Sequence, residues 1–104
     1  MYESKSKSPE TDELCRAILS LKSVEECYRF FDDIFTIREI KDISQRLQVA
    51  KLLRSGAIFN EIVKKTGAST ATIARVNRCL NYGADGYKMI LNRLDEEEKK
   101  EIKE

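Results

Sequence analysis

The fold of this chain is decided by residues 59–78, FNEIVKKTGASTATIARVNR. The apolar residues on each side of Gly67 recur at the spacing of one helix face. They are Phe59, Ile62 and Val63 before the glycine and Ile73, Val76 and Leu80 after it. Glycine at position 67 adopts positive φ readily and ends the first helix, while Ser69 is a typical N-cap for the second. Two short helices joined by a tight glycine turn predict a helix-turn-helix.

The second helix of this motif predicts a surface suited to duplex DNA. If its apolar residues face the core, the opposite face presents small and hydroxylated side chains together with arginines. These residues are Ser69, Thr70, Ala71, Thr72, Ala74, Arg75 and Arg78. Small side chains let a helix approach base edges, its first N–H groups attract phosphate, and a guanidinium forks onto guanine or phosphate. A structural helical hairpin with solvated arginines is the alternative interpretation.

Positive charge gathers around the same motif. The whole chain has a net charge of +1, but residues 51–92 hold seven basic and two acidic side chains, a net charge of +5. Residues 1–50 and residues 93–104 each have a net charge of −2. Clustered basic residues are the electrostatic footprint of a phosphate-binding surface. Arg54, Lys64 and Lys65 therefore join the predicted DNA-binding residues.

The composition favours a small all-α domain and gives no support for an enzyme. The chain has 104 residues, 36% of them charged, with one proline, four glycines and no histidine. Carboxylates cluster only at Asp32 and Asp33 and in the C-terminal tail, without metal spacing or a phosphate-binding loop. We therefore predict no catalytic site and no metal site. With no membrane-spanning run and no signal peptide, we expect a cytoplasmic protein without membrane contact.

Cys15, Cys27 and Cys79 match no zinc or redox spacing. Each lies on or beside an apolar stripe, so we expect all three to be buried as small hydrophobic residues.

Six helices are expected along the chain. Helix starts are predicted at Ser8, before Pro9, and at the capping boxes that begin at Ser23 and Thr36. The first helix is expected to run to about residue 22, the third to about residue 55, and the sixth to begin near residue 85. Residues 1–8 are expected to be a flexible N-terminus, residues 9–94 the domain, and residues 95–104 a charged C-terminal tail.

The amount of apolar surface predicts a second copy of the chain. The second helix is rich in aromatic residues and the third has a wide apolar stripe, which is more than so small a monomer buries easily. A homodimer also fits the motif, because two recognition helices one DNA turn apart read a palindrome.

Three segments resemble a known family. They are residues 35–47, FTIREIKDISQRL, residues 51–56, KLLRSG, and residues 66–83, TGASTATIARVNRCLNYG. Together with their order they are similar to the Trp repressor superfamily, most closely its YerC/YecD-type branch, over roughly residues 10–94. The resemblance implies an all-α, six-helix, intertwined homodimer that binds DNA as a transcriptional regulator.

The resemblance also implies where a corepressor would bind. Trp repressor holds tryptophan with two arginines, and Arg46 and Arg75 fall at similar places here. A glycine follows the second arginine in the repressor, whereas this chain has Val76, whose branched side chain fills the space next to the indole. Tryptophan is therefore not expected as a corepressor, and no cofactor is predicted.

Some other positions of this chain match the Trp repressor pattern, and two differ from it. Thr70, Ala71 and Ala74 match base-facing positions of the repressor's recognition helix. Val63 stands where a small alanine usually allows close helix approach. Ile58 stands where a Ser or Thr cap usually opens the first helix of the motif, and a missing cap costs on the order of 1 kcal/mol.

We therefore expect a sequence-specific DNA-binding transcriptional regulator that acts as a homodimer on double-stranded DNA. The alternative is a protein-interaction module with a vestigial helix-turn-helix that no longer binds DNA. The aromatic second helix and the wide stripe of the third motivate this alternative, and a monomer with an exposed apolar patch and no DNA binding would favour it.

Overall fold

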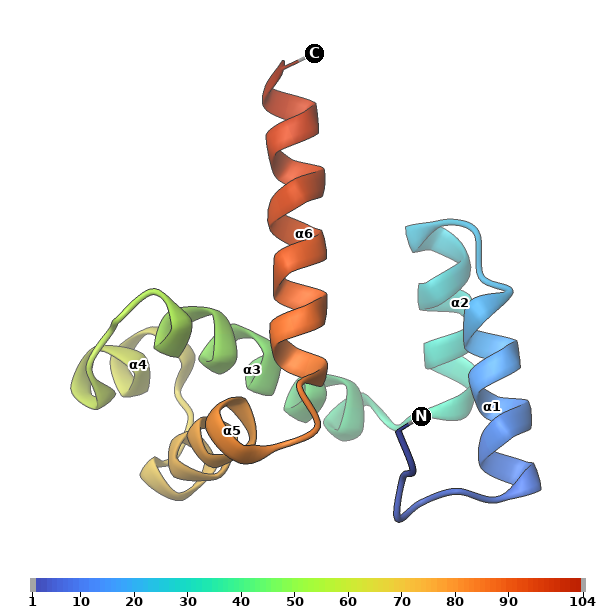
Figure 1. Ribbon diagram of the computed structural model, residues 1–104, viewed down its shortest axis with the longest axis horizontal. Coiled ribbons are helices and arrows are strands. Elements are labelled where there is room, and N and C mark those ends of the chain that lie inside the picture. The colour runs from blue at the N-terminus through green and yellow to red at the C-terminus, as the bar shows by residue number, and fades with distance from the viewer. Residues whose placement is uncertain (1, 104) are drawn as a thin grey trace. The chain divides into compact units, whose positions relative to one another are not determined.

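The structure is a computed structural model that describes the backbone of residues 2–103 and the side chains of residues 2–101. Its elements are six α-helices, shown in Figure 1: α1 (Pro9–Leu19), α2 (Val24–Ile34), α3 (Ile37–Arg54), α4 (Phe59–Thr66), α5 (Thr70–Tyr82) and α6 (Gly86–Lys103). No strand occurs within residues 2–103. The predicted all-α, six-helix fold class is confirmed.

The three predicted helix starts in the first part of the chain are confirmed. The hydroxyls of Ser8, Ser23 and Thr36 each accept a hydrogen bond from the N–H three residues ahead, at 3.0, 3.1 and 3.1 Å. The Glu39 carboxylate in turn accepts from the Thr36 N–H at 2.9 Å. This backbone hydrogen bond, helped by the Thr36 hydroxyl, lowers the pKa of Glu39 below its ordinary value of 4.5.

One helix end differs from the expectation, and the extent of the last helix adds to it. α1 ends at Leu19 instead of near residue 22, because the N–H of Ser20 already bonds the carbonyls of the last turn and its hydroxyl donates to the Ala17 carbonyl at 2.6 Å. α6 continues through the predicted tail as far as Lys103. Glutamate and lysine are good helix formers, so a charge run need not end a helix.

The chain divides into two compact units after Ile40. The first unit contains α1 and α2, and neither helix has a single buried residue. Its aromatic side chains pack on one another, with the rings of Phe31 and Phe35 5.6 Å apart and nearly perpendicular. The first unit thus has an aromatic cluster but no closed core of its own.

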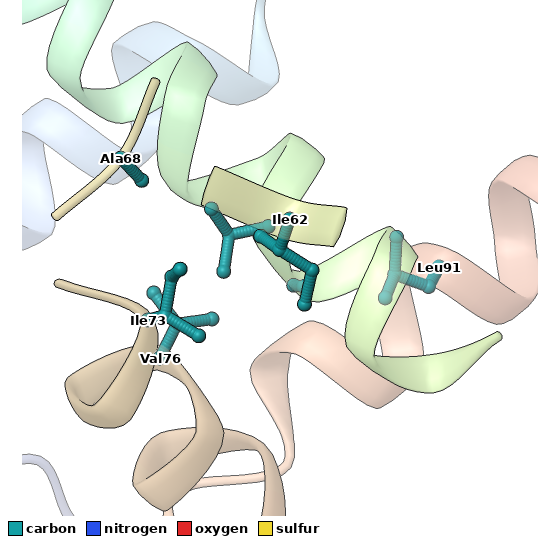
Figure 2. Packing of buried hydrophobic residues seen from close by; sticks show 7 residues of the cluster. Ile62, Ala68, Ile73, Val76 and Leu91 are labelled. Atoms are coloured by element: carbon teal, nitrogen blue, oxygen red, sulfur yellow. The ribbon is translucent and has the colours of Figure 1, made fainter. Parts of the chain in front are cut away.

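The second unit holds the hydrophobic core. Its seven buried members come from α3, α4, the turn after α4, α5 and α6: Val49, Ala50, Ile62, Ala68, Ile73, Val76 and Leu91. In Figure 2 the side chains of Ile62, Ala68, Ile73 and Val76 gather between the turn and its two helices, while Leu91 comes from α6. Because α5 turns Ile73 and Val76 inward, its opposite face is left outside.

Phe59 and Val63, expected on the buried face of α4, are 39% and 36% exposed in this chain. α4 is only eight residues long, and Ile62 alone enters the core.

Candidate nucleic-acid interface

The turn between α4 and α5 has the geometry predicted from Gly67 and Ser69. Gly67 ends α4 with φ +73°, in the left-handed region, and its N–H donates to the Val63 carbonyl at 2.9 Å. The Ser69 hydroxyl accepts from the Thr72 N–H at 3.1 Å and so caps α5. α4 and α5 therefore form a helix-turn-helix (Figure 1).

Three further residues hold this turn, and sequence reasoning missed them. The Thr66 hydroxyl donates to the Ile62 carbonyl at 2.7 Å and accepts from the Ala68 N–H at 3.1 Å. The Gln45 amide, on α3, donates to the Thr66 carbonyl at 3.1 Å. The methyl of Ala68 fills the core under the turn. A small apolar residue between the glycine and the cap was a local signal for Ala68, but Gln45 carries no local signal.

The outer face of α5 collects the predicted base-facing residues. We call this set the outer face, and it consists of Ser69, Thr70, Ala71, Ala74, Arg75 and Arg78, with Thr72 half-buried beside them. Ile73, Val76 and Leu80 lie on the buried side of the same helix. No residue of α5 is acidic. The outer face is therefore a surface of methyls, hydroxyls and guanidinium groups attached to one rigid helix.

The predicted basic residues outside α5 fall into two groups. Lys64 and Lys65 lie in the last turn of α4 and are exposed, next to the turn. Arg54, at the end of α3, is instead bonded to α6. One of its terminal nitrogens donates to the Asn92 side-chain oxygen at 2.8 Å, and the other forms an ion pair with Asp95. The charge of Arg54 is thus paired within the chain.

The two corepressor-like arginines lie in different surroundings. Arg46 is half-buried and lines an apolar cavity of about 550 Å³ with Ile43, Leu47, Cys79 and Tyr87 among its neighbours. Arg75 does not line this cavity and is exposed.

Val76, which follows the second arginine, is 2% exposed. Its side chain belongs to the core cluster between α4 and α5. The position next to Arg75 is therefore filled by a packed valine.

The expectation that all three cysteines are buried is wrong, since none of them is fully buried. Cys15 and Cys79 are exposed, and only Cys27 is half-buried. Successive residues lie about 100° apart around a helix, so Cys79, although adjacent to the buried Leu80, is on the flank of α5.

The part of the chain that the structure describes holds no group of three His, Cys, Asp or Glu side chains that could bind a metal ion. None of the described helices combines the length and the apolar character needed to cross a membrane.

Residues 9–95 match the family model described as Trp repressor protein. The chain belongs to the Trp repressor family. YerC of Bacillus subtilis (strain 168), an uncharacterized protein, is 56% identical over 98 residues, which are 94% of this chain and 94% of YerC. The resemblance stated from the sequence is confirmed.

Solved structures of the family have the same fold. A crystal structure from Staphylococcus aureus, described provisionally as a Trp repressor, has a TM-score of 0.85 and 52% identity, covering 88% of this chain and 91% of its own. A TrpR-like protein from Eubacterium eligens ATCC 27750 also has a TM-score of 0.85, with 54% identity over 88% of this chain and 94% of its own. The chain therefore has a Trp repressor-like fold.

Proposed function

We propose that this member of the Trp repressor family is a sequence-specific transcriptional regulator that binds double-stranded DNA as a homodimer. Membership in a family of non-enzymatic DNA-binding regulators supports the proposal. The observation that carries it is the outer face of α5, which is free of acidic residues and held by a capped glycine turn. Such a helix fits the major groove, where base edges display their distinct donors and acceptors.

The basic residues and the small residues have different roles in this proposal. Lys64, Lys65, Arg75 and Arg78 bind phosphates and supply most of the affinity. The N–H groups of the first turn of α5 that Ser69 does not cap add a further phosphate site. Thr70, Ala71 and Ala74 lie against base edges and thymine methyls, and so contribute the sequence preference.

A second copy of the chain completes the DNA-binding unit. α1 and α2 have no buried residues, and Val24 and Tyr28 of α2 are 73% and 63% exposed. Large apolar side chains exposed together mark an interface. We propose that two copies intertwine over these faces and present two α5 helices about one DNA turn apart, roughly 34 Å. Binding to DNA also implies a cytoplasmic location.

Val76 also bears on the corepressor. It stands where the resemblance to Trp repressor would require a glycine, and its branched side chain is packed in the core. We therefore do not propose tryptophan as a corepressor.

The test is a salt titration of DNA affinity with the double variant Arg75→Ala, Arg78→Ala. We expect weaker binding and a shallower dependence of log K on log salt, by about 0.9 for each phosphate that the variant no longer neutralises. The control variant Arg93→Ala, Lys99→Ala removes the same charge from exposed positions of α6. If the α5 variant keeps both the affinity and the slope of the wild type, the proposal is wrong.

A protein-interaction module remains the second candidate, because the apolar side chains of α2 are so exposed. A monomeric wild-type protein that binds no duplex DNA in the same titration would favour it.

A further inference from the structure

The last residue of α3 makes a three-point attachment to α6 that the proposed DNA contacts do not use. One terminal nitrogen of Arg54 donates to the Asn92 oxygen at 2.8 Å. The other reaches the Leu91 carbonyl at 3.5 Å and forms an ion pair with Asp95. The Arg54 side chain is only 31% exposed. These three acceptors lie close together along α6, and they fit the planar fork of a guanidinium.

This attachment extends the core contact between the two helices to the surface. Ala50, one turn before Arg54 on α3, is fully buried in the same cluster as Leu91 of α6. Arg54 therefore adds polar contacts between the end of α3 and the middle of α6 at the edge of this core.

The position of α6 is passed on to the end of α5. Only residues 83–85 connect α5 to α6. The connector is constrained at both ends, since the Gly83 N–H donates to the Cys79 carbonyl at 2.8 Å and Asp85 has φ +64°. A displacement of α6 must therefore move the last turn of α5.

A groove next to Arg54 lies among α3, α5 and α6, beside the end of α5. The groove has a volume of about 450 Å³, and Arg54, Asn77, Asn81 and Asn92 are among its lining residues. Side chains of α3 and α5 leave this space open, whereas α5 and α6 contact each other directly, so α6 restrains the end of α5.

We propose that Arg54 is a positioning residue, whose fork onto Asn92, Asp95 and the Leu91 carbonyl sets α6 and thereby the angle of the recognition helix α5. The pairing with Asp95 also removes most of the net positive potential that a phosphate contact at Arg54 would need. The sequence alone had assigned Arg54 to the phosphate-binding residues. The part of the inference that concerns DNA rests on the proposed function, whereas the part that concerns α5 does not.

The experiment compares Arg54→Lys, Arg54→Gln and Asp95→Asn with the wild type. Glu96→Gln is the matched control, because it removes the same charge from the next, exposed carboxylate of α6. The first readout is the set of backbone amide chemical shifts of residues 79–82, measured by NMR on the folded proteins without DNA. We expect the three test variants to shift these amides in the same direction and the control to leave them in place.

The second readout is the ratio of affinities for a selected operator and for random duplex DNA. We expect the test variants to lower this ratio by roughly two- to thirty-fold, the range for residues that couple to a site without touching the ligand. The salt slope should stay that of the wild type. Lysine should not rescue the ratio, because its one ammonium nitrogen cannot replace the two guanidinium nitrogens that bond Asn92 and Asp95.

Two results would overturn the inference. The first is an unchanged amide pattern at residues 79–82 in all three test variants, which would deny the link from Arg54 to α5. The second is the behaviour of a phosphate contact: full rescue by Arg54→Lys, a slope lowered by about 0.9 per protomer in Arg54→Gln, and tighter DNA binding by Asp95→Asn than by Glu96→Gln. If the wild type binds no DNA, the proposed function fails, and the amide shifts still decide the role of Arg54.

Discussion

Gln45 on α3 donates a hydrogen bond from its side-chain amide to the main-chain carbonyl of Thr66, 3.1 Å away and 21 residues later in the sequence. The bond ties the long helix of the second unit to the turn that orients α5. It lies at the end of α4, where helix carbonyls lack partners within the helix.

Gln45→Leu should therefore destabilise the protein by about 1 kcal/mol. The Thr66 carbonyl would lose its hydrogen-bond donor at a partly buried position. Urea unfolding followed by circular dichroism measures the change. Gln48→Leu, at an exposed position of the same helix, is the control and should have little effect. Equal stabilities of the two variants would show that the bond contributes nothing.

Gly67→Ala should cost about 1–2 kcal/mol of folding stability, because φ is +73° at this position and an L side chain is strained there. The strain is conformational, since an added Cβ meets nothing within 4 Å. Gly86→Ala also places its methyl in open space, but without positive φ. It should therefore stabilise the start of α6 by about 0.4–1 kcal/mol. Thermal unfolding of both variants measures the contrast, and a Gly67→Ala protein as stable as the wild type would contradict the left-handed turn.

Ile58→Ser should be more stable than Ile58→Ala by about 1 kcal/mol. Ile58 opens α4 with extended backbone and gives no side-chain hydrogen bond, so the first N–H groups of the helix lack a cap. Comparing serine with alanine removes the effect of deleting the isoleucine side chain, which is 60% exposed. Chemical denaturation decides the matter, and equal midpoints would mean that α4 does not use a cap here.

The folding stability should depend on the Glu39 carboxylate at acidic pH. Its folded-state pKa is lowered, mainly by the Thr36 N–H, so the stabilisation is present above the ordinary value of 4.5 and is lost as pH falls through the folded-state pKa. Glu39→Gln should therefore be less stable than the wild type at pH 7. The difference in the free energy of unfolding between the two proteins should become smaller below pH 4.5. Unfolding curves at several pH values test this. A gap that stays constant down to the acid transition would contradict the role of the charge.

The local parts of this structure were predictable from the sequence because they obey short-range rules. Gly67 and Ser69 define the turn by backbone preference and capping alone, and the 3.6-residue period places Ile73 and Val76 inside. The same period predicted that Arg75 lies outside, as it does.

The contacts between distant residues were not predictable in this way. The bonds from Arg54 to α6 span 37 to 41 residues. No local sequence pattern distinguishes an arginine that binds phosphate from one that is paired within the chain. The burial of Cys79 was predicted wrongly because a position at the edge of a stripe depends on the neighbouring helix. The apolar stripe of α2 has no buried residue in this chain, and the spacing of its residues does not reveal whether the stripe is covered within one chain.

We propose above all that the outer face of α5 reads DNA in the major groove. The most direct measurement is a selection of bound sequences from random duplex DNA, run in parallel with the wild type and Ala74→Glu. Ala74 is exposed on α5, so the variant should fold normally while its carboxylate repels phosphates and base acceptors. We predict that the wild type enriches a palindrome with half-sites about 10 base pairs apart, or a multiple of this, and that the variant enriches none. No enrichment by the folded wild type, or the same palindrome from both proteins, would contradict the account.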